Sequence, residues 1–191
     1  MQNEPIEVTL KVTNAFEQLG IPYLIADSLA STLYGMVRTT QDSDIIAEMQ
    51  SEHIQPFISA LKNEFFIDEE MIIDAVQRNS SFNIIHRDTM FKVDVFIPRP
   101  RPFQQSQLAR AQRQSFEFES EQSANFASAE DTILSKLEWY RMGGEVSDRQ
   151  WRDVIGVLKT RAGELDINYL RKWAQELNVA DIFEHALTEA K

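Results

Sequence analysis

One acidic residue inside an apolar run restricts the folds open to this chain more than any other feature. Residues 91–98, FKVDVFIP, are typical of a strand, in which successive side chains point to opposite faces. The odd-numbered apolar residues therefore share one face, and Lys92, Asp94 and Phe96 share the other. A preceding run at 81–86 and the turn at 87–89 predict a β-hairpin. Because an isolated buried charge is costly, Asp94 needs a partner, either a basic side chain or a metal ion.

A second acidic feature lies upstream, where Asp42 and Asp44 precede Ile45 and Ile46. These four residues indicate the start of a strand, and the strand period of two places both carboxylates on one face. Such a pair can share a hard divalent cation such as Mg²⁺, which prefers oxygen ligands and is usually held by one or two carboxylates plus substrate phosphates. The alternative is a polar turn, TTQDSD, whose side chains bond to local backbone groups.

The elements before this pair predict a phosphate site. Apolar spacing predicts a helix over 6–19, stopped by Gly20 and Pro22, and then a buried strand over 23–26. Asp27 and Ser28 follow as candidate N-cap residues of a short helix. A helix N-terminus offers unpaired N–H groups and partial positive charge to an anion, although Ser28 as a simple helix cap is an equal alternative.

The remaining sequence predicts helices around this core. An amphipathic helix is expected over 51–65, and 68–76 fits either a short helix or an irregular segment. The run PRPRPFQQ is expected to be an extended loop. From Ser128 onward the pattern is helical, with a break at Gly143-Gly144 and further helices over 166–177 and 179–190.

Arginines concentrate near that expected loop. They form either a solvated connector or a local basic patch that steers a polyanionic substrate, because such a field persists over about a Debye length. The residues are Arg99, Arg101, Arg110 and Arg113.

Charge and composition exclude several classes of function. With 191 residues and a net charge of −11, the chain suits one domain or a small α/β core with a helical appendage, and it opposes non-specific binding to nucleic acid or anionic lipid. The absence of cysteine excludes disulfides, thiolate nucleophiles and Cys-ligated zinc. The N-terminal sequence lacks signal-peptide features and no apolar run approaches a membrane span, so we expect a cytoplasmic protein without a membrane partner.

The order of these parts resembles the nucleotidyltransferase superfamily of the DNA polymerase β type, in particular its small bacterial members. Those proteins carry a Gly-Ser or Gly-Gly element before a short helix, then Gly, Arg, Thr and Asp-x-Asp, and a third Asp on a later strand. The residues at matching places are Ser28, Gly35, Arg38, Thr40, Asp42, Asp44 and Asp94. The stretches SAEDTILSKLEWYR and SDRQWRDVIGVL, with Lys136 and Asp153, are similar to the helical tail of abortive-infection toxin-like and antibiotic nucleotidyltransferase-like members.

The resemblance covers roughly residues 20–160 and implies a fold. That fold is of the α+β class, with a mixed or antiparallel sheet and flanking helices in a nucleotidyltransferase-like core, followed by a C-terminal helical bundle. We expect the core over 1–127 and the helical part, packed on it, over 128–191.

The resemblance also implies an activity, the transfer of a nucleoside monophosphate from a nucleoside triphosphate such as ATP to a small molecule, tRNA or protein. Asp42 and Asp44 would hold Mg²⁺ or Mn²⁺, and Asp94 would complete the catalytic metal site or take the acceptor proton. The candidates for nucleotide binding are Asp27, Ser28, Arg38, Thr40 and Lys136, although a lysine on a helix face, such as Lys136, is more often solvated.

Asp27 departs from the pattern, because it stands where the family has glycine. At about 4 Å and an effective dielectric constant near 20, two unit charges interact by about 4 kcal/mol, enough to weaken nucleotide binding severely. Asp27 must therefore point away, bind a cation or mark a changed site. Two alternatives to an enzyme that modifies a small molecule stay open. One, favoured by Asp27, is a catalytically silent nucleotide-binding or protein-interaction module. The other is a toxin with the same chemistry whose protein partner is an antitoxin.

Overall fold

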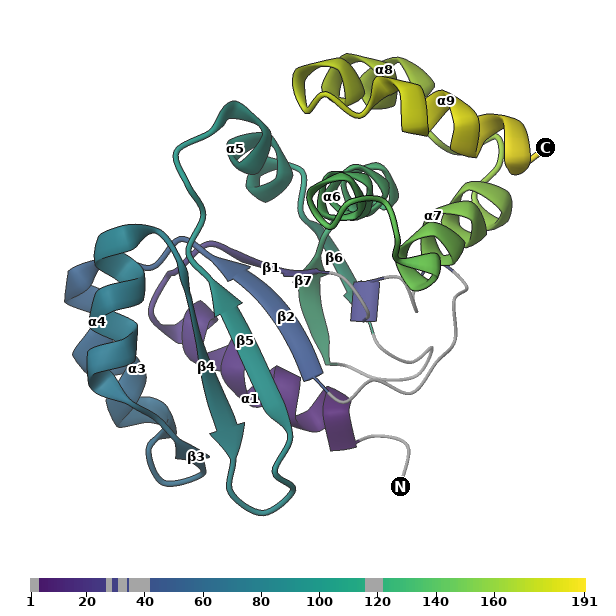
Figure 1. Cartoon of the computed structure of the whole chain (residues 1–191). Coiled ribbons are helices and arrows are strands. Elements are labelled where there is room, and N and C mark those ends of the chain that lie inside the picture. Colours follow the sequence, from purple (N-terminus) through teal and green to yellow (C-terminus); the bar gives the residue numbers. More distant parts are fainter. Residues whose placement is uncertain (1–3, 27–28, 31–33, 35–41, 116–121) are drawn as a thin grey trace. The chain divides into compact units, whose positions relative to one another are not determined.

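The computed structural model describes residues 4–26, 29–30, 34, 42–115 and 122–191 (Figure 1). The chain divides into two compact units. The first comprises Met1–Ala26 and Thr39–Phe126, and the second comprises Asp27–Arg38 and Ala127–Lys191. The second unit thus joins a short segment after β1 to the C-terminal residues, and the expected division at 127/128 stays a prediction.

Tyr34 gives the physical reason for this grouping. Its hydroxyl donates a hydrogen bond to the carbonyl oxygen of Ala127 at 2.6 Å, and its own carbonyl oxygen accepts one from Thr160 Oγ1 at 2.5 Å. The Arg161 guanidinium lies 5.2 Å from the centre of the Tyr34 ring. These contacts attach Tyr34 to the C-terminal helices.

A seven-stranded mixed sheet forms the centre of the first unit, with strand order β3-β4-β5-β2-β1-β7-β6. The β2–β5 and β1–β7 pairs are parallel, and the other neighbours are antiparallel. The strands are β1 (Tyr23–Ala26), β2 (Asp42–Ala47), β3 (Phe65–Phe66), β4 (Ser81–His86), β5 (Lys92–Phe96), β6 (Gln112–Ser115) and β7 (Ser123–Phe126). The expected α+β class, the strand at 23–26, the strand starting with the paired aspartates and the hairpin are confirmed.

The core of the first unit lies between one face of this sheet and its helices. Helices α1 (Glu4–Gln18) and α3 (Ile54–Leu61) contact each other, α1 contacts β2, and α4 (Glu69–Arg78) contacts β4. Figure 1 shows α1 crossing behind the strands. The ring of Phe57 stacks on Phe16 with centroids 5.0 Å apart and meets Phe82 of β4 edge-on at 6.1 Å. This aromatic cluster joins two helices to the sheet.

Two predicted elements differ from the structure. The helix expected over 51–65 consists of a 3-10 turn, η1 (Ser51–His53), and α3, and it ends at Leu61. Phe65 instead lies in β3, opposite His86, where its side chain is fully buried. The expected extended loop contains α5 (Pro102–Ala109), which begins at a proline. Proline is tolerated there because the N–H groups of the first helical turn have no partner within the helix, so the missing N–H costs nothing.

The ambiguous segment at 68–76 is helical. The Asp68 side chain caps α4 by accepting hydrogen bonds from the backbone N–H groups of Glu70 and Met71. Asn79 ends the helix in the left-handed conformation, with φ at 48°. The apolar pattern fitted either a short helix or an irregular segment, and capping at both ends favours the helix.

The second unit contains the helices expected from the sequence. They are α6 (Ala129–Met142), α7 (Asp148–Thr160), α8 (Ile167–Glu176) and α9 (Ala180–Glu189). Ser128, Ser147 and Asp166 cap α6, α7 and α8. Each side chain accepts a hydrogen bond from the backbone N–H of the residue three positions later. Within the described part of the chain, no helix combines the length and apolar character needed to cross a membrane.

We expect Phe57→Ala to lower the free energy of unfolding by about 3–5 kcal/mol, because it opens a cavity beneath two aromatic partners. The matched control is Phe66→Ala, which truncates a ring that is 48% exposed and should cost far less. Urea unfolding followed by circular dichroism measures both. All three tryptophans, Trp139, Trp151 and Trp173, lie in the second unit, so fluorescence reports that unit separately. Equal costs for the two variants would contradict the assignment of Phe57 to the core.

Candidate functional site

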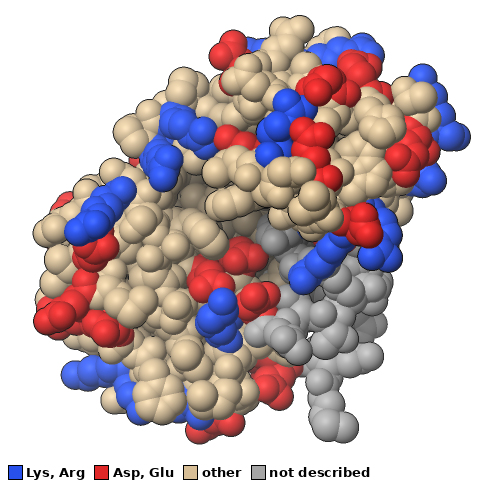
Figure 2. Space-filling view, in the orientation of Figure 1, with Lys and Arg blue, Asp and Glu red and all other residues tan. Residues whose placement is uncertain are grey.

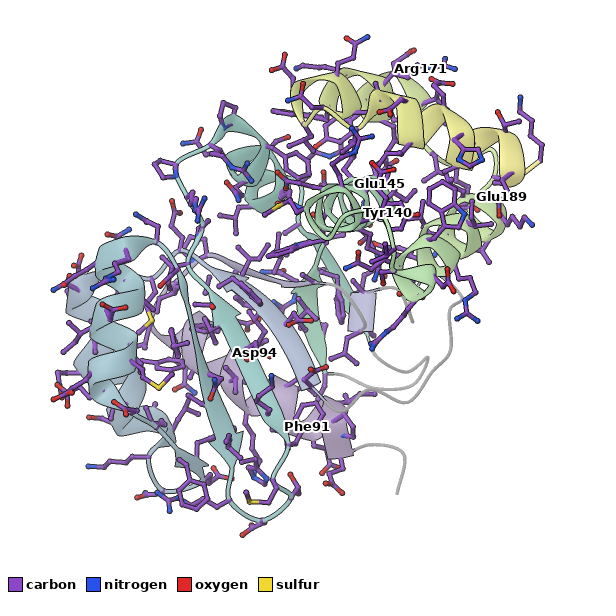
Figure 3. All side chains as sticks on the ribbon, in the orientation of Figure 1. Phe91, Asp94, Tyr140, Glu145, Arg171 and Glu189 are labelled. Atoms are coloured by element: carbon purple, nitrogen blue, oxygen red, sulfur yellow. The ribbon has the colours of Figure 1, made fainter. Side chains whose placement is uncertain are left out.

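The strand pairing collects the acidic residues on one face of the sheet. In the parallel β2–β5 pair, Asp44 lies opposite Asp94, and Asp42 lies opposite Lys92. Side chains at paired positions point to the same face, and alternation sends Val93 and Val95 into the core on the other face, where both are fully buried. Asp94 lies in the middle of β5 (Figure 3). Asp42, Asp44 and Asp94 therefore share a face, as the alternation predicted for each strand.

Polar residues continue along a row across neighbouring strands. Asn83 of β4 lies opposite Asp94, which lies opposite Asp44, which in turn lies opposite Ala26. Ala26 is the last residue of β1, so the chain leaves the sheet beside this row. Asp27 and Ser28 come next in the sequence but lie outside the described residues. Asn83 was not among the predicted site residues, although its place in the hairpin could have suggested it.

Lys92 is the basic partner that Asp94 required. Its Nζ donates a hydrogen bond to Asp94 Oδ2 at 2.6 Å and lies 3.9 Å from Asp42 Oδ2. The hydrogen bond to Asp94 raises the pKa of Lys92, and the charges of Asp94, Asp42 and Asp44 raise it further, against the opposing effect of desolvation. In Figure 2, acidic side chains gather beside a basic one on this face of the first unit. Lys92 therefore remains protonated and neutralises part of the local negative charge.

The chemistry of the acidic row suits a hard divalent cation, because it offers carboxylate oxygens and one amide on a single face. Among the described residues, however, no three His, Cys, Asp or Glu side chains are arranged to hold a metal ion. The Asp94 carboxylate is directed toward Lys92 instead. The side-chain types suit a divalent cation, but in this structure Asp94 is paired with Lys92. Metal binding by Asp42, Asp44 and Asp94 stays a prediction.

Four of the five predicted nucleotide-binding residues, Asp27, Ser28, Arg38 and Thr40, lie outside the described residues. Lys136 of α6 is described, and its Nζ donates a hydrogen bond to Asp153 Oδ2 at 2.8 Å within the second unit. Both side chains are buried, so the alternative of a solvated lysine is wrong. Nucleotide binding by Lys136 stays a prediction.

Arg101 and Arg113 bond to different partners. Arg113 lies on β6, at the edge of the sheet, where its Nη1 donates a hydrogen bond to Glu17 Oε1 at 2.6 Å. The Tyr23 hydroxyl donates to the same oxygen at 2.6 Å. Arg101, which follows β5, instead bonds through Nε to Gln104 Oε1 at 3.0 Å. Arg113 therefore connects α1 to the sheet edge.

Comparisons with known proteins agree on the fold. By sequence, the chain matches no family model and no curated protein. Its structure is similar to an antigenic nucleotidyltransferase-like protein from Paracoccidioides brasiliensis, with 16% identity, a TM-score of 0.56 and coverage of 98% of this chain and 93% of that one. It is also similar to ANT(2'')-Ia in complex with adenylyl-2''-tobramycin, with 12% identity, a TM-score of 0.56 and coverage of 91% and 96%. The chain has the nucleotidyltransferase fold.

A pair of variants separates the structural role of Lys136 from its predicted nucleotide binding. Lys136→Met should lower the free energy of unfolding by about 3–5 kcal/mol, because the buried Asp153 carboxylate loses the ammonium group of its ion pair. The double variant Lys136→Met/Asp153→Leu should recover most of this loss. Tryptophan fluorescence during urea unfolding measures both. A stable double variant that binds ATP as well as the wild type would remove Lys136 from the nucleotide site.

Proposed function

We propose that this protein is a metal-dependent nucleotidyltransferase, which transfers a nucleoside monophosphate from a nucleoside triphosphate to an acceptor hydroxyl or phosphate. The acceptor oxygen bonds to the α-phosphorus, and the bond from that phosphorus to the bridging oxygen breaks to release pyrophosphate. The observation that carries the proposal is the β2–β5 register, which sets Asp44 beside Asp94 and keeps Asp42 on the same face in a nucleotidyltransferase fold. The polar face is also the one beside which β1 ends, and the sequence places Asp27 and Ser28 directly after it.

In this proposal the protein residues position charge, because nucleotidyl transfer depends mainly on alignment and electrostatic stabilisation. Asp42 and Asp44 would hold Mg²⁺ or Mn²⁺, and Asp94 would complete that site or accept the proton of the attacking hydroxyl. A bound divalent cation would supply positive charge that neutralises the triphosphate. Ser28 and Arg38 contact the phosphates, and Thr40 and Lys136 contribute to nucleotide binding.

The acceptor is the open part of the proposal. One solved structure of similar fold is a complex with adenylyl-2''-tobramycin, a small molecule that carries an adenylyl group. This supports testing ATP with small-molecule acceptors first, and then tRNA and protein pools. A toxin would be recognised by growth arrest on expression, relieved by a partner antitoxin.

Labelled nucleoside triphosphates with Mg²⁺ or Mn²⁺ test the activity directly. We expect Asp44→Asn and Asp94→Asn each to lower turnover by at least about a hundredfold, which corresponds to about 2.7 kcal/mol of activation free energy. The matched control, Asp88→Asn, changes an exposed carboxylate in the turn between β4 and β5 and should retain activity. Removing divalent cations with EDTA should abolish transfer. If the wild type transfers no label to any of these pools, the enzymatic proposal fails.

A catalytically silent nucleotide-binding or protein-interaction module is the second candidate. The Lys92–Asp94 ion pair favours it, because a carboxylate neutralised by lysine has less need of a metal. Asp27 favours it as well, because its charge stands where the family pattern has glycine.

Asp27→Gly distinguishes the two candidates. If the site receives a triphosphate, removal of this charge should raise nucleotide affinity by about tenfold after solvent screening. If Asp27 instead binds the metal or orients Ser28, the same change should abolish metal-dependent binding. Titration calorimetry with ATP and GTP, with and without Mg²⁺, measures the change. Absence of binding by both proteins under all conditions would favour the silent interaction module.

A further inference from the structure

We propose that Lys92 is a built-in counter-ion that competes with the divalent cation for the carboxylates of the candidate site. In the metal-free protein its ammonium group neutralises Asp94 and Asp42, and it withdraws when a cation binds. This inference rests on the proposed function and assigns to that site a residue that controls when metal can enter.

The position of Lys92 is fixed by strand geometry. It precedes Asp94 by two residues in β5, so the two side chains share a face, and it lies opposite Asp42 in β2. Its Nζ lies 2.6 Å from Asp94 Oδ2 and 3.9 Å from Asp42 Oδ2. The positive charge therefore lies at the same acidic face to which the proposed function assigns the metal.

The exposure of the two partners allows exchange. The Lys92 side chain is 41% exposed, whereas that of Asp94 is only 19% exposed. A lysine carries its charge on a flexible four-carbon stem, so Lys92 can turn into solvent without moving the strand. Asp94 has less freedom, and its carboxylate stays available for the next cation.

Charge repulsion makes the two occupants mutually exclusive. Like charges at neighbouring positions of adjacent strands destabilise a sheet, so the metal-free acidic row needs a cation. A divalent cation bound beside a lysine ammonium would repel it at short range, where screening by salt is weak. Lys92 therefore stabilises the empty site and lowers its affinity for metal.

The test is titration of Mn²⁺ alone into wild type, Lys92→Met and Lys62→Met by calorimetry. Methionine keeps an unbranched side chain and removes the charge, and Lys62, exposed just after α3, gives the same change of net charge elsewhere in the first unit. We expect Lys92→Met to lower the Mn²⁺ dissociation constant by about tenfold or more, and Lys62→Met to change it by less than about twofold. Lys92→Arg keeps the charge and should stay close to wild type.

A second readout needs no metal. In EDTA, Lys92→Met should melt at a lower temperature than Lys62→Met, because the acidic row has lost its counter-ion, and added Mn²⁺ should reverse the order. If Lys92→Met fails to fold in EDTA, Lys92→Gln takes its place in both experiments. Adding Asp44→Asn to the Lys92 variant should remove the gain in affinity.

The outcomes separate this inference from the proposed function. If the wild type and Lys92→Met bind Mn²⁺ equally well, the competition is overturned while the metal site stands. If Lys92→Met loses Mn²⁺ binding, Lys92 arranges the carboxylates for the metal and does not compete with it. If no variant binds Mn²⁺, both this inference and the metal-dependent function are overturned.

Discussion

The parallel pairing of β2 with β5 is the interaction on which the first unit depends. It joins the β3-β4-β5 half of the sheet to the β2-β1-β7-β6 half. On one face it buries Ile45 beside Val95, and on the other it sets Asp44 beside Asp94. A shift by one residue would move the aspartates into the core, where an unpaired charge is costly, so the core and the candidate site enforce the same register. The β2–β5 register therefore determines both the stability of the sheet and the geometry of the acidic face.

Local signals in the sequence predicted the elements but not all of their partners. Alternation in β5 and the hairpin turn act over a few residues, and these predictions are confirmed. The β2–β5 register was not predicted, because no local pattern says which distant strand pairs with which. The apolar spacing over 51–65 predicts that Phe65 belongs to a helix. Phe65 instead pairs with β4 and lies in a strand. The proline-rich pattern around Pro102 predicts an extended loop, but proline is also favourable at the first position of a helix, and α5 begins there.

The second unit uses buried polar groups to select one arrangement of its helices. Ser128 caps α6 by accepting from the Asp131 backbone N–H, and its hydroxyl donates to Asp131 Oδ2 at 2.8 Å. The Tyr169 hydroxyl of α8 donates to Asp131 Oδ1 at 2.7 Å, and the Lys136–Asp153 pair joins α6 to α7. Each of these groups would be costly to leave unpaired, so other packings of the helices are penalised. Tyr34 lies in the same unit, where its hydroxyl donates a hydrogen bond to the carbonyl oxygen of Ala127.

The Lys92–Asp94 pair explains why the sequence allowed two interpretations of Asp94. A strand carboxylate needs a positive charge in every state of the protein, and the chain supplies one two residues away on the same face. Asp94 forms a permanent salt bridge if the Lys92 ammonium group cannot move away, and it can act as a metal ligand if that group can. Had both partners been deeply buried, the pair would be fixed, because withdrawing one would leave an uncompensated charge in the interior. Lys92 is substantially exposed, so water can take over its solvation when a cation replaces it, and the pair is compatible with an active site as well as with a silent one.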